Sequence, residues 1–339
     1  MSAHTSSRKS RRSRSRAGRA VLAATAATAL TALAAGCAGS AHSSADGGKS
    51  KTFTLGVTTA DTTIPFLASM DSALQAEATR LGMKTTILNG NLDNATQAAN
   101  VQNLIAKRVS LIIVCSSSPA AVLPAIRQAN AAGIPVIALN AQLGAGPKLV
   151  TYVGDSDFAY GKGEGSLILK ALPHGGKIAI ELGPLGDTPQ VERLKGIKDA
   201  LNGHPEIKIV ATPVDDFKNS ENLKVTQDLL SKYPKGSLDV VVAEGPEMYV
   251  GAQYAQKAGR TDIKFIAGDY SQQVEAAIKS GALFGTVNQS PALEGRLAAQ
   301  YAHDWLTGNK KAVPQPNAYI PLPLITKDNV DANPAEWSG

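Results

Sequence analysis

Histidine and cysteine, the side chains that most often carry enzyme chemistry, are few and scattered in this sequence. The five histidines are His4, His42, His174, His204 and His303, and the first two precede residue 50. The chain has no H-E-x-x-H pair for a zinc-bound water, no G-x-S-x-G turn for an activated serine and no G-x-x-x-x-G-K-[ST] loop for nucleotide phosphates. The sequence therefore predicts that the protein is not an enzyme, and it implies no metal and no organic cofactor.

Two other stretches contain residue types that could do chemistry. The run Gly161–Gly165 is glycine-rich, but it falls inside a predicted helix rather than after a strand, so we interpret it as a site of close helix packing. Asp215 and Asp216 are adjacent carboxylates in a predicted turn, and we interpret them as solvated rather than as a catalytic pair. Neither stretch changes the prediction of a non-enzymatic protein.

The N-terminal residues predict a cleavable leader. Residues 1–36 carry seven basic side chains and no acidic one, and residues 20–36 form a short, Ala-rich apolar run that is typical of a signal peptide rather than a membrane span. The ending Leu-Ala-Ala-Gly-Cys at 33–37 resembles a lipoprotein lipobox, which would make Cys37 the acylated first residue of the mature chain. Residues 37–50 are small and polar and predict a flexible tether. A plain secretory peptide is the alternative.

Most of the positive charge belongs to that leader. The whole chain has a formal net charge of +6, but outside residues 1–36 there are 27 basic and 28 acidic side chains, which leaves −1. Nucleic-acid binding needs a basic surface on the folded protein, so it is not expected here. The other cysteine, Cys115, ends the apolar run LIIVC, and we expect a buried free thiol there.

The predicted secondary structure begins with one strand–turn–helix unit. An extended apolar run at 53–57 leads into a Thr-rich turn, and Pro65 then suits the first position of a helix that extends to Leu81. The turn places Phe66 at the carboxyl end of the strand. In open α/β sheets that edge is where ligands bind.

The same unit recurs almost to the end of the chain. Buried-type strands alternate with amphipathic helices, as expected when helices cover both faces of a parallel sheet. The predicted strands are 84–89, 111–115, 135–140, 177–182, 208–213, 238–245, 262–269 and 284–289, and the predicted helices are 94–107, 118–132, 157–171, 191–201, 219–231, 246–258, 271–280 and 291–307. The segment 318–326 finishes the fold. The pattern predicts an α/β fold built from two consecutive Rossmann-like halves.

Six short pieces of sequence, in order, resemble the type I periplasmic sugar-binding proteins of ABC transporters, close to the ribose-binding branch. They are Pro65-Phe66, GIPVIALN at 133–140, ERLKG at 192–196, EMYVGA at 247–252, Gly268-Asp269 and VNQSP at 287–291. The resemblance covers most of residues 51–327. It implies two lobes with parallel sheets, joined by three hinge strands, with one ligand in the cleft.

The resemblance also implies how the chain is divided. The leader is 1–36 and the tether 37–50; the N-terminal lobe takes 51–154 plus 290–320, and the C-terminal lobe takes 155–289 plus 321–331. The three crossings then fall near 154–156, 289–290 and 320–322. Both lobes are therefore expected to be discontinuous in sequence.

Family ligand positions can be carried over one residue at a time. The resemblance places stacking aromatic rings at Phe66 and Phe217 and hydrogen-bonding side chains at the remaining positions. Sugar hydroxyls both donate and accept, so amides, carboxylates and a guanidinium can satisfy them while rings cover apolar faces. The expected polar ligand residues are Asn140, Arg193, Glu244, Asp269 and Gln289.

Several positions depart from the family pattern. In the first turn, Ile64 replaces a polar residue of the family and Leu67 replaces a second aromatic residue. Ala141 replaces an arginine after the fourth strand, and Gly245 replaces an asparagine. Glu244, next to Gly245, could supply hydrogen bonds in place of that asparagine. One wall of the site is therefore expected to be less polar than in a ribose site.

Each assigned residue also has a purely structural interpretation. Phe66 could belong to the core, Asp269 could cap the following helix through Ser271, and Asn140 could satisfy turn backbone. Arg193 could pair only with an acid such as Asp187, whose own expected role is helix capping.

The sequence thus predicts a monomeric, extracytoplasmic solute-binding lipoprotein, held on the outer face of the cell membrane through Cys37. Its expected partners are a sugar or polyol-like small molecule and the permease subunits of an ABC importer. A receptor of the same fold that acts in signalling is the alternative. A transcription regulator would need a helix-turn-helix before the first strand, where this chain has its leader and tether.

Overall fold

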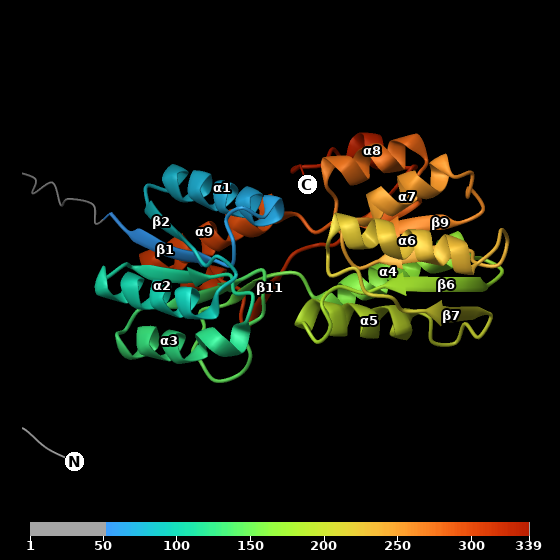
Figure 1. Ribbon diagram of the computed structural model, residues 1–339. Coiled ribbons are helices and arrows are strands. Elements are labelled where there is room, and N and C mark those ends of the chain that lie inside the picture. The colour runs from blue at the N-terminus through green and yellow to red at the C-terminus, as the bar shows by residue number, and fades with distance from the viewer. Residues whose placement is uncertain (1–51, 339) are drawn as a thin grey trace, which may run out of the picture. The chain divides into compact units, whose positions relative to one another are not determined.

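A computed structural model describes residues 52–338, which belong to one compact unit of the chain, 50–339. The predicted leader, the acylated Cys37 and the tether lie outside the described residues. None of the described helices combines the length and the hydrophobicity needed to traverse a lipid bilayer. The described residues form an α/β fold with two six-stranded sheets (Figure 1).

The first sheet has the strand order β11-β5-β4-β3-β1-β2, and every pair in it is parallel. We call this sheet and the four helices packed on it the first lobe. Its strands are β1 Thr54–Thr59, β2 Lys84–Asn89, β3 Leu111–Val114, β4 Val136–Leu139, β5 Tyr152–Gly154 and β11 Asn317–Tyr319. Its helices are α1 Pro65–Arg80, α2 Asn94–Ala106, α3 Pro119–Ala131 and α9 Pro291–Thr307.

The second sheet has the order β12-β10-β9-β8-β6-β7, and we call it and its five helices the second lobe. Its strands are β6 Gly176–Glu181, β7 Ile207–Ala211, β8 Val240–Ala243, β9 Lys264–Ala267, β10 Gly285–Val287 and β12 Leu324–Thr326. Its helices are α4 Asp157–Ala171, α5 Thr188–Ala200, α6 Asn219–Lys232, α7 Met248–Lys257 and α8 Gln272–Ser280. Two short 3₁₀ turns, Lys310–Ala312 and Val330–Ala332, complete the fold.

Each sheet is buried on both faces. In the first lobe α1 and α9 cover one face, and α2 and α3 cover the other. In the second lobe α6, α7 and α8 pack on one face, and α4 and α5 on the other. Neighbouring strand residues such as Ile112 and Ile113 contribute to opposite cores, which is why the strands read as continuous apolar runs.

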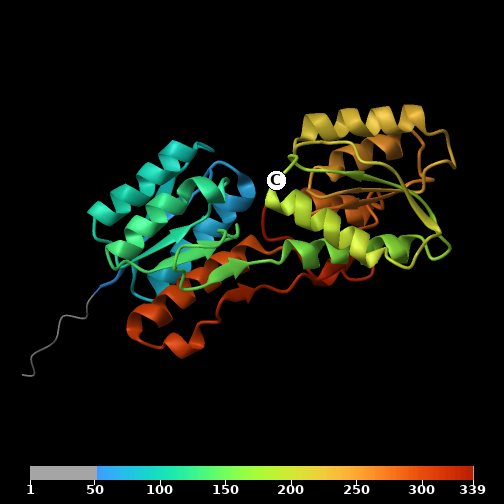
Figure 2. The ribbon, with the colours of Figure 1, turned by 90° about the horizontal axis from the view of Figure 1, so that it is seen from below.

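Helix α9 lies with the first lobe although it follows the second lobe in sequence (Figure 2). Its small residues Ala298, Ala299 and Ala302 join the core that contains α1. Gly295 makes this contact close, because a Cβ at that position would lie 2.1 Å from the Met70 carbonyl oxygen.

The segment 318–326, within which a crossing near 320–322 is expected, belongs to both sheets. It divides into β11 in the first sheet and β12 in the second, with residues 320–323 between them. Strand β12 pairs with β10 in the antiparallel sense. The reason is topological: β10 runs toward the crossing and β12 runs away from it, so the two neighbours point in opposite directions.

The Gly161–Gly165 stretch lies inside α4 and packs closely, as predicted. A Cβ on Gly161 would lie 1.9 Å from the Arg193 carbonyl oxygen, and one on Gly196 would lie 2.2 Å from the Phe158 carbonyl oxygen. Helices α4 and α5 therefore touch backbone to backbone. This contact fixes Arg193 against the start of α4.

Candidate functional site

A cavity of about 1340 Å³ is lined by residues of both lobes. The first lobe contributes Ile64, Leu67, Ser116–Pro119 and Asn140–Ala145, and the second lobe contributes Asp157, Gly186–Pro189 and Phe217. A smaller cavity of about 370 Å³ lies in the second lobe beside Lys264, at the opposite end of β9, and contains none of the predicted ligand residues.

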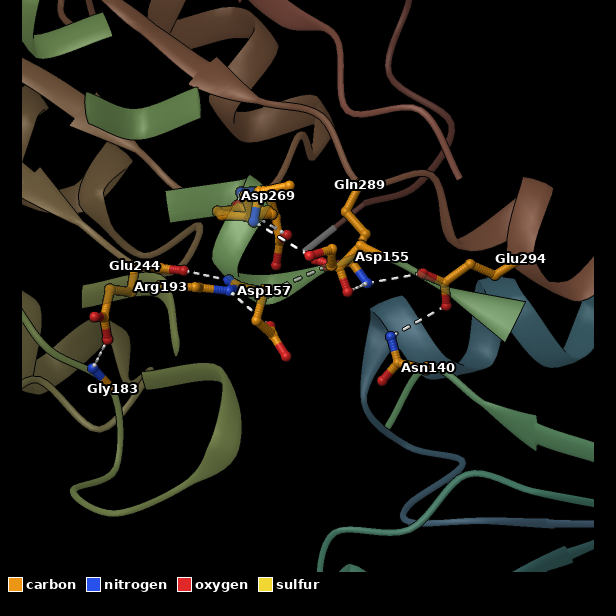
Figure 3. A network of polar contacts seen from close by, with 12 residues as sticks. Asn140, Asp155, Asp157, Gly183, Arg193, Glu244, Asp269, Gln289 and Glu294 are labelled. Carbon is orange, nitrogen blue, oxygen red and sulfur yellow. Dashed lines mark hydrogen bonds and ion pairs between the residues drawn. The ribbon is translucent and has the colours of Figure 1, made fainter. Parts of the chain in front are cut away.

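Several polar residues follow directly after strands. Asn140 follows β4, Asp155 follows β5, Glu244 follows β8, and Asp269 and Gln289 stand two residues beyond β9 and β10. Because parallel strands present their carboxyl ends at one edge of a sheet, this placement gathers these side chains. Figure 3 shows the resulting network of polar contacts.

Arg193, in α5, is the only cation at the centre of the described network. Its side chain is buried, with 6% of the residue exposed. The guanidinium donates to Asp157 Oδ1 at 3.3 Å, to the Glu244 carbonyl oxygen at 2.6 Å and to Gln289 Oε1 at 3.2 Å (Figure 3). Its Cζ also lies 3.7 Å from the centre of the Tyr160 ring. Arg193 therefore forms its ion pair with Asp157. It does not pair with Asp187, the partner named in its purely structural interpretation.

Asp269 lies beside the same tyrosine. Its Oδ1 accepts a hydrogen bond from the Tyr160 hydroxyl at 3.1 Å, and its backbone N–H donates to that hydroxyl oxygen. The cap of α8 comes instead from Ser271, whose hydroxyl accepts from Val274 N–H at 3.3 Å. Asp269 is therefore held by side chains that surround Arg193 and does not cap α8 itself.

Gln289 connects the second lobe to the first. Its Nε2 donates to Glu294 Oε1 at 2.8 Å and to Asp155 Oδ1 at 3.4 Å. Glu294, near the start of α9, accepts from Asn140 Nδ2 at 3.1 Å through its other oxygen. The chain Asn140–Glu294–Gln289–Arg193 is thus a continuous polar path from β4 to α5 (Figure 3). The Asn140 side chain does not satisfy turn backbone, which was its alternative role.

Phe217 lies on the cavity wall over two glycines. A Cβ on Gly183 would lie 2.1 Å from the Phe217 ring, and a Cβ on Gly245 would lie 2.6 Å from it. The family asparagine is therefore replaced by glycine at a place where any side chain collides with this ring. Glu244 accepts from Gly183 N–H at 2.9 Å and is fully buried, so it supports the loop under the ring and does not line the cavity.

Three of the predicted ligand residues adopt the left-handed backbone conformation. The φ angles are 63° at Asn140, 55° at Phe217 and 46° at Asp269. Asn and Asp enter this region readily, but a phenylalanine there is uncommon and strained. Such strain gathers at ligand sites, where it aims a side chain that regular backbone would not present.

Phe66 has a different environment. It is the second residue of α1 and packs partly against the first-lobe core. Its ring meets Trp337 edge to face, with ring centres 5.6 Å apart. Ile64, two residues before it, and Leu67, directly after it, line the cavity together with Ala141, but Phe66 is not among the lining residues.

Burial raises the pKa of most acids in this region. It raises the pKa of Asp155 to about 7, and those of Glu244 and Glu247 to about 8. Burial alone would lower the pKa of Arg193, but the acidic groups around it outweigh that effect and raise it. The guanidinium therefore stays charged and is the fixed cation around which the carboxyls are arranged.

Sequence reasoning did not assign Asp155, Asp157, Tyr160 or Glu294 to this network. The first two lie just beyond β5, at the end of a buried strand, and this placement was the available signal. Nothing local distinguishes Tyr160 or Glu294, which reach the network only because α4 and α9 pack where they do. Asp187 lines the cavity at the start of α5, and its side chain forms no cap hydrogen bond there.

Cys115 is a buried free thiol, as predicted, and burial raises its pKa to about 12. Within residues 52–338 no group of three or more His, Cys, Asp or Glu side chains is arranged to hold a metal ion.

A family model described as periplasmic binding protein domain matches residues 55–310. The chain belongs to the periplasmic binding protein family. It is 30% identical to the ribose import binding protein of Bacillus subtilis (strain 168), over 84% of this chain and 90% of that one. It is 32% identical to the xylitol-binding protein of Mycolicibacterium smegmatis, over 83% of this chain and 79% of that one.

Solved structures have the same fold. An ABC transporter solute binding protein from Bacillus halodurans, with bound myo-inositol, superposes with a TM-score of 0.76 at 26% identity and covers 84% of this chain and 98% of its own. Together these findings identify a type I periplasmic binding protein that resembles the ribose-binding proteins, that is, an extracytoplasmic solute-binding protein of an ABC importer and not an enzyme.

Proposed function

We propose that this protein captures one sugar or sugar-like polyol between its two lobes and delivers it to an ABC permease. The ligand residues are Arg193, Asp269, Gln289 and Asn140, with Phe217 and Phe66 as the aromatic surfaces and Glu244 as a supporting group. The observation that carries the proposal is the buried Arg193, oriented by three hydrogen-bonding partners, one of which, Asp157, lines a cavity to which both lobes contribute.

The ligand's chemistry follows from the groups on the two walls. A hydroxyl-rich ligand can donate to the carboxylates and accept from the guanidinium and the amides, which is the combination the second lobe offers. Ile64, Leu67 and Ala141 make part of the facing wall apolar, beside the polar Ser116–Ser118. We infer a ligand with hydroxyls concentrated on one side and a less hydroxylated face toward the first lobe.

Capture requires the lobes to approach each other. The cavity of about 1340 Å³ exceeds the roughly 300–1000 Å³ that is usual for small-molecule pockets. The hinge we propose consists of the crossings near 154–156, 289–290 and 320–322, between an N-terminal lobe of 51–154 plus 290–320 and a C-terminal lobe of 155–289 plus 321–331. A ligand with micromolar affinity releases ~8 kcal/mol, enough to shift a hinge equilibrium of a few kcal/mol.

Thermal-shift and calorimetric titrations with ribose, xylitol and myo-inositol test the proposal. We expect at least one of them to raise the unfolding temperature, and we expect Arg193→Ala and Asp269→Ala to abolish that rise. Arg260→Ala is the matched control, because Arg260 is also well hydrogen-bonded in the second lobe, to Asp262 and to two backbone carbonyls, but lines only the smaller cavity. Binding that survives in both site variants would refute the assignment.

The lipid anchor is a separate part of the proposal. Acylation of Cys37 would hold the mature protein on the outer face of the cell membrane, because several acyl chains together make anchoring stable. We expect the anchored protein to be a monomer. A Cys37→Ser variant should appear in the soluble fraction after export. Retention of that variant on the membrane would contradict the anchor and leave the binding site unaffected.

A further inference from the structure

The C-terminal residues contact both lobes beside the candidate site. We define the C-terminal strap as residues 333–338, which lie beyond the 55–310 matched by the family model. In Figure 1 this end of the chain lies between α1 and α8. The strap therefore lies outside the matched residues, and the family resemblance assigns it no role.

The strap is anchored on the second lobe through backbone groups. The Tyr270 hydroxyl donates to the Asn333 carbonyl oxygen at 2.7 Å, and Ala335 N–H donates to Glu275 Oε2 at 2.8 Å. The Trp337 carbonyl oxygen accepts from Gln272 N–H at 2.9 Å, at the first turn of α8. The first of these contacts involves Tyr270, which directly follows Asp269. The strap is therefore attached to the second lobe near the carboxyl end of β9.

The same few residues reach the first lobe. Glu336 accepts from the Ser290 hydroxyl, directly after Gln289, and lies 4.0 Å from Arg296 in α9. Trp337 places its ring against Phe66 at 5.6 Å, with the ring planes 83° apart. The strap thus contacts Phe66 itself and the residues that directly follow two other proposed ligand residues, Asp269 and Gln289.

Trp337 is buried although it stands two residues from the chain end, with 6% of it exposed. Its indole N–H has no hydrogen-bond partner among residues 52–338. Buried indole N–H groups normally find an acceptor. The Trp337 ring is therefore buried for its contact with Phe66 and not for a hydrogen bond of its indole N–H.

We propose that Trp337, held in place by the C-terminal strap, is a positioning residue that holds the Phe66 ring for ligand contact and thereby determines which sugars fit. The edge-to-face contact restricts the Phe66 ring to one orientation. A ring fixed before the ligand arrives loses less conformational freedom on binding, and this favours affinity. The proposal rests on the sugar-binding function above and deepens it.

The two tryptophans of the chain permit a direct test, since the other one, Trp305, lies on α9 with Lys310 4.6 Å from its ring centre. In a Trp305→Phe protein all tryptophan fluorescence comes from Trp337. We expect this fluorescence to change when the sugar that binds the unaltered protein, from ribose, xylitol and myo-inositol, is added. A Trp337→Phe protein, which reports Trp305 alone, should show little change.

Affinity and selectivity complete the experiment. Trp337→Ala should weaken binding of that sugar about tenfold and change the ratio of affinities across the three probes, as loss of a ring contact would. Trp337→Phe should restore most of the affinity, and Trp305→Phe should alter it less than twofold.

The outcomes separate the two proposals. Binding by the unaltered protein together with an unaffected Trp337→Ala variant would overturn the strap proposal and leave the proposed function in place. Tighter binding after Trp337→Ala would also overturn it, because the strap would then obstruct the cleft. If none of the three probes binds the unaltered protein, both proposals fail.

Discussion

The two lobes share one architecture but bring opposite chemistry to the cavity between them. The second lobe supplies a buried guanidinium, carboxylates and a strained phenylalanine, all fixed by hydrogen bonds or close glycine contacts. The first lobe supplies Ile64, Leu67, Ala141 and small serines, with Asn140 as its amide in the network. In the function we propose, the second lobe would orient the ligand and discriminate between ligands, and the first lobe would supply the surface that closes over it.

The largest difference in stability between variants of the two lobes should come from the loss of Arg193. Arg193→Ala leaves the carboxylate of Asp157 and the amide of Gln289 without their buried partner, so we expect the free energy of unfolding to fall by about 3–5 kcal/mol. Asn140→Ala removes one hydrogen bond to Glu294 and should cost about 1–2 kcal/mol. Urea unfolding measures both values. Equal losses would contradict the division of roles between the lobes.

A pair of glycines offers the next comparison. Gly245→Ala places a Cβ 2.6 Å from the Phe217 ring, and we expect sugar affinity to fall more than tenfold, or about 1.4 kcal/mol, as the ring is displaced. Gly144→Ala is the matched control on the first-lobe wall, because a Cβ there meets nothing within 4 Å. Calorimetric titration should show less than a twofold change for the control. A comparable loss at Gly144 would show that the first-lobe wall is as specific as the second.

The acids of the two lobes should give different pH profiles. Burial raises the pKa of Glu244 to about 8 and that of Asp71, in the first lobe, to about 6. The folded protein therefore keeps protons that the unfolded chain has released, and stability falls as pH rises from about 4.5 to 8 for Glu244 and from about 4 to 6 for Asp71. Glu244→Gln should flatten the decline up to pH 8, and Asp71→Asn only its lower part. Thermal unfolding between pH 4.5 and 9 measures this, and an unchanged slope above pH 6 in Glu244→Gln would contradict it.

The smallest effect should come from the apolar wall. Ile64 lines the cavity, but only 36% of its surface is exposed, so Ile64→Ala removes little area that a ligand could bury. We expect an affinity loss of about threefold, below 1 kcal/mol. A loss above tenfold in titration would assign the first-lobe wall a specific contact.

Element types and their order were readable from the sequence because the buried strands and amphipathic helices alternate without interruption. The split of residues 318–326 between two sheets could be expected only from the family resemblance, since a continuous apolar run carries no mark of where it changes lobes. Arg193 was found through a short motif, whereas Glu294 was not, because its place in the network depends on how α9 packs against α1. The meeting of Phe66 with Trp337 joins residues 271 positions apart, and no local pattern indicates it.

Gly161 and Gly196 have a consequence for how such a protein can acquire a new ligand. Backbone contact between α4 and α5 prevents either helix from rotating or sliding against the other. Arg193 in α5 and Asp157 at the start of α4 therefore keep a fixed relative position. We therefore expect substitutions that change ligand selectivity to lie in the loops around the Arg193–Asp157 pair. Engineering of a sugar sensor from this scaffold should vary those loops and leave the glycine crossing unaltered.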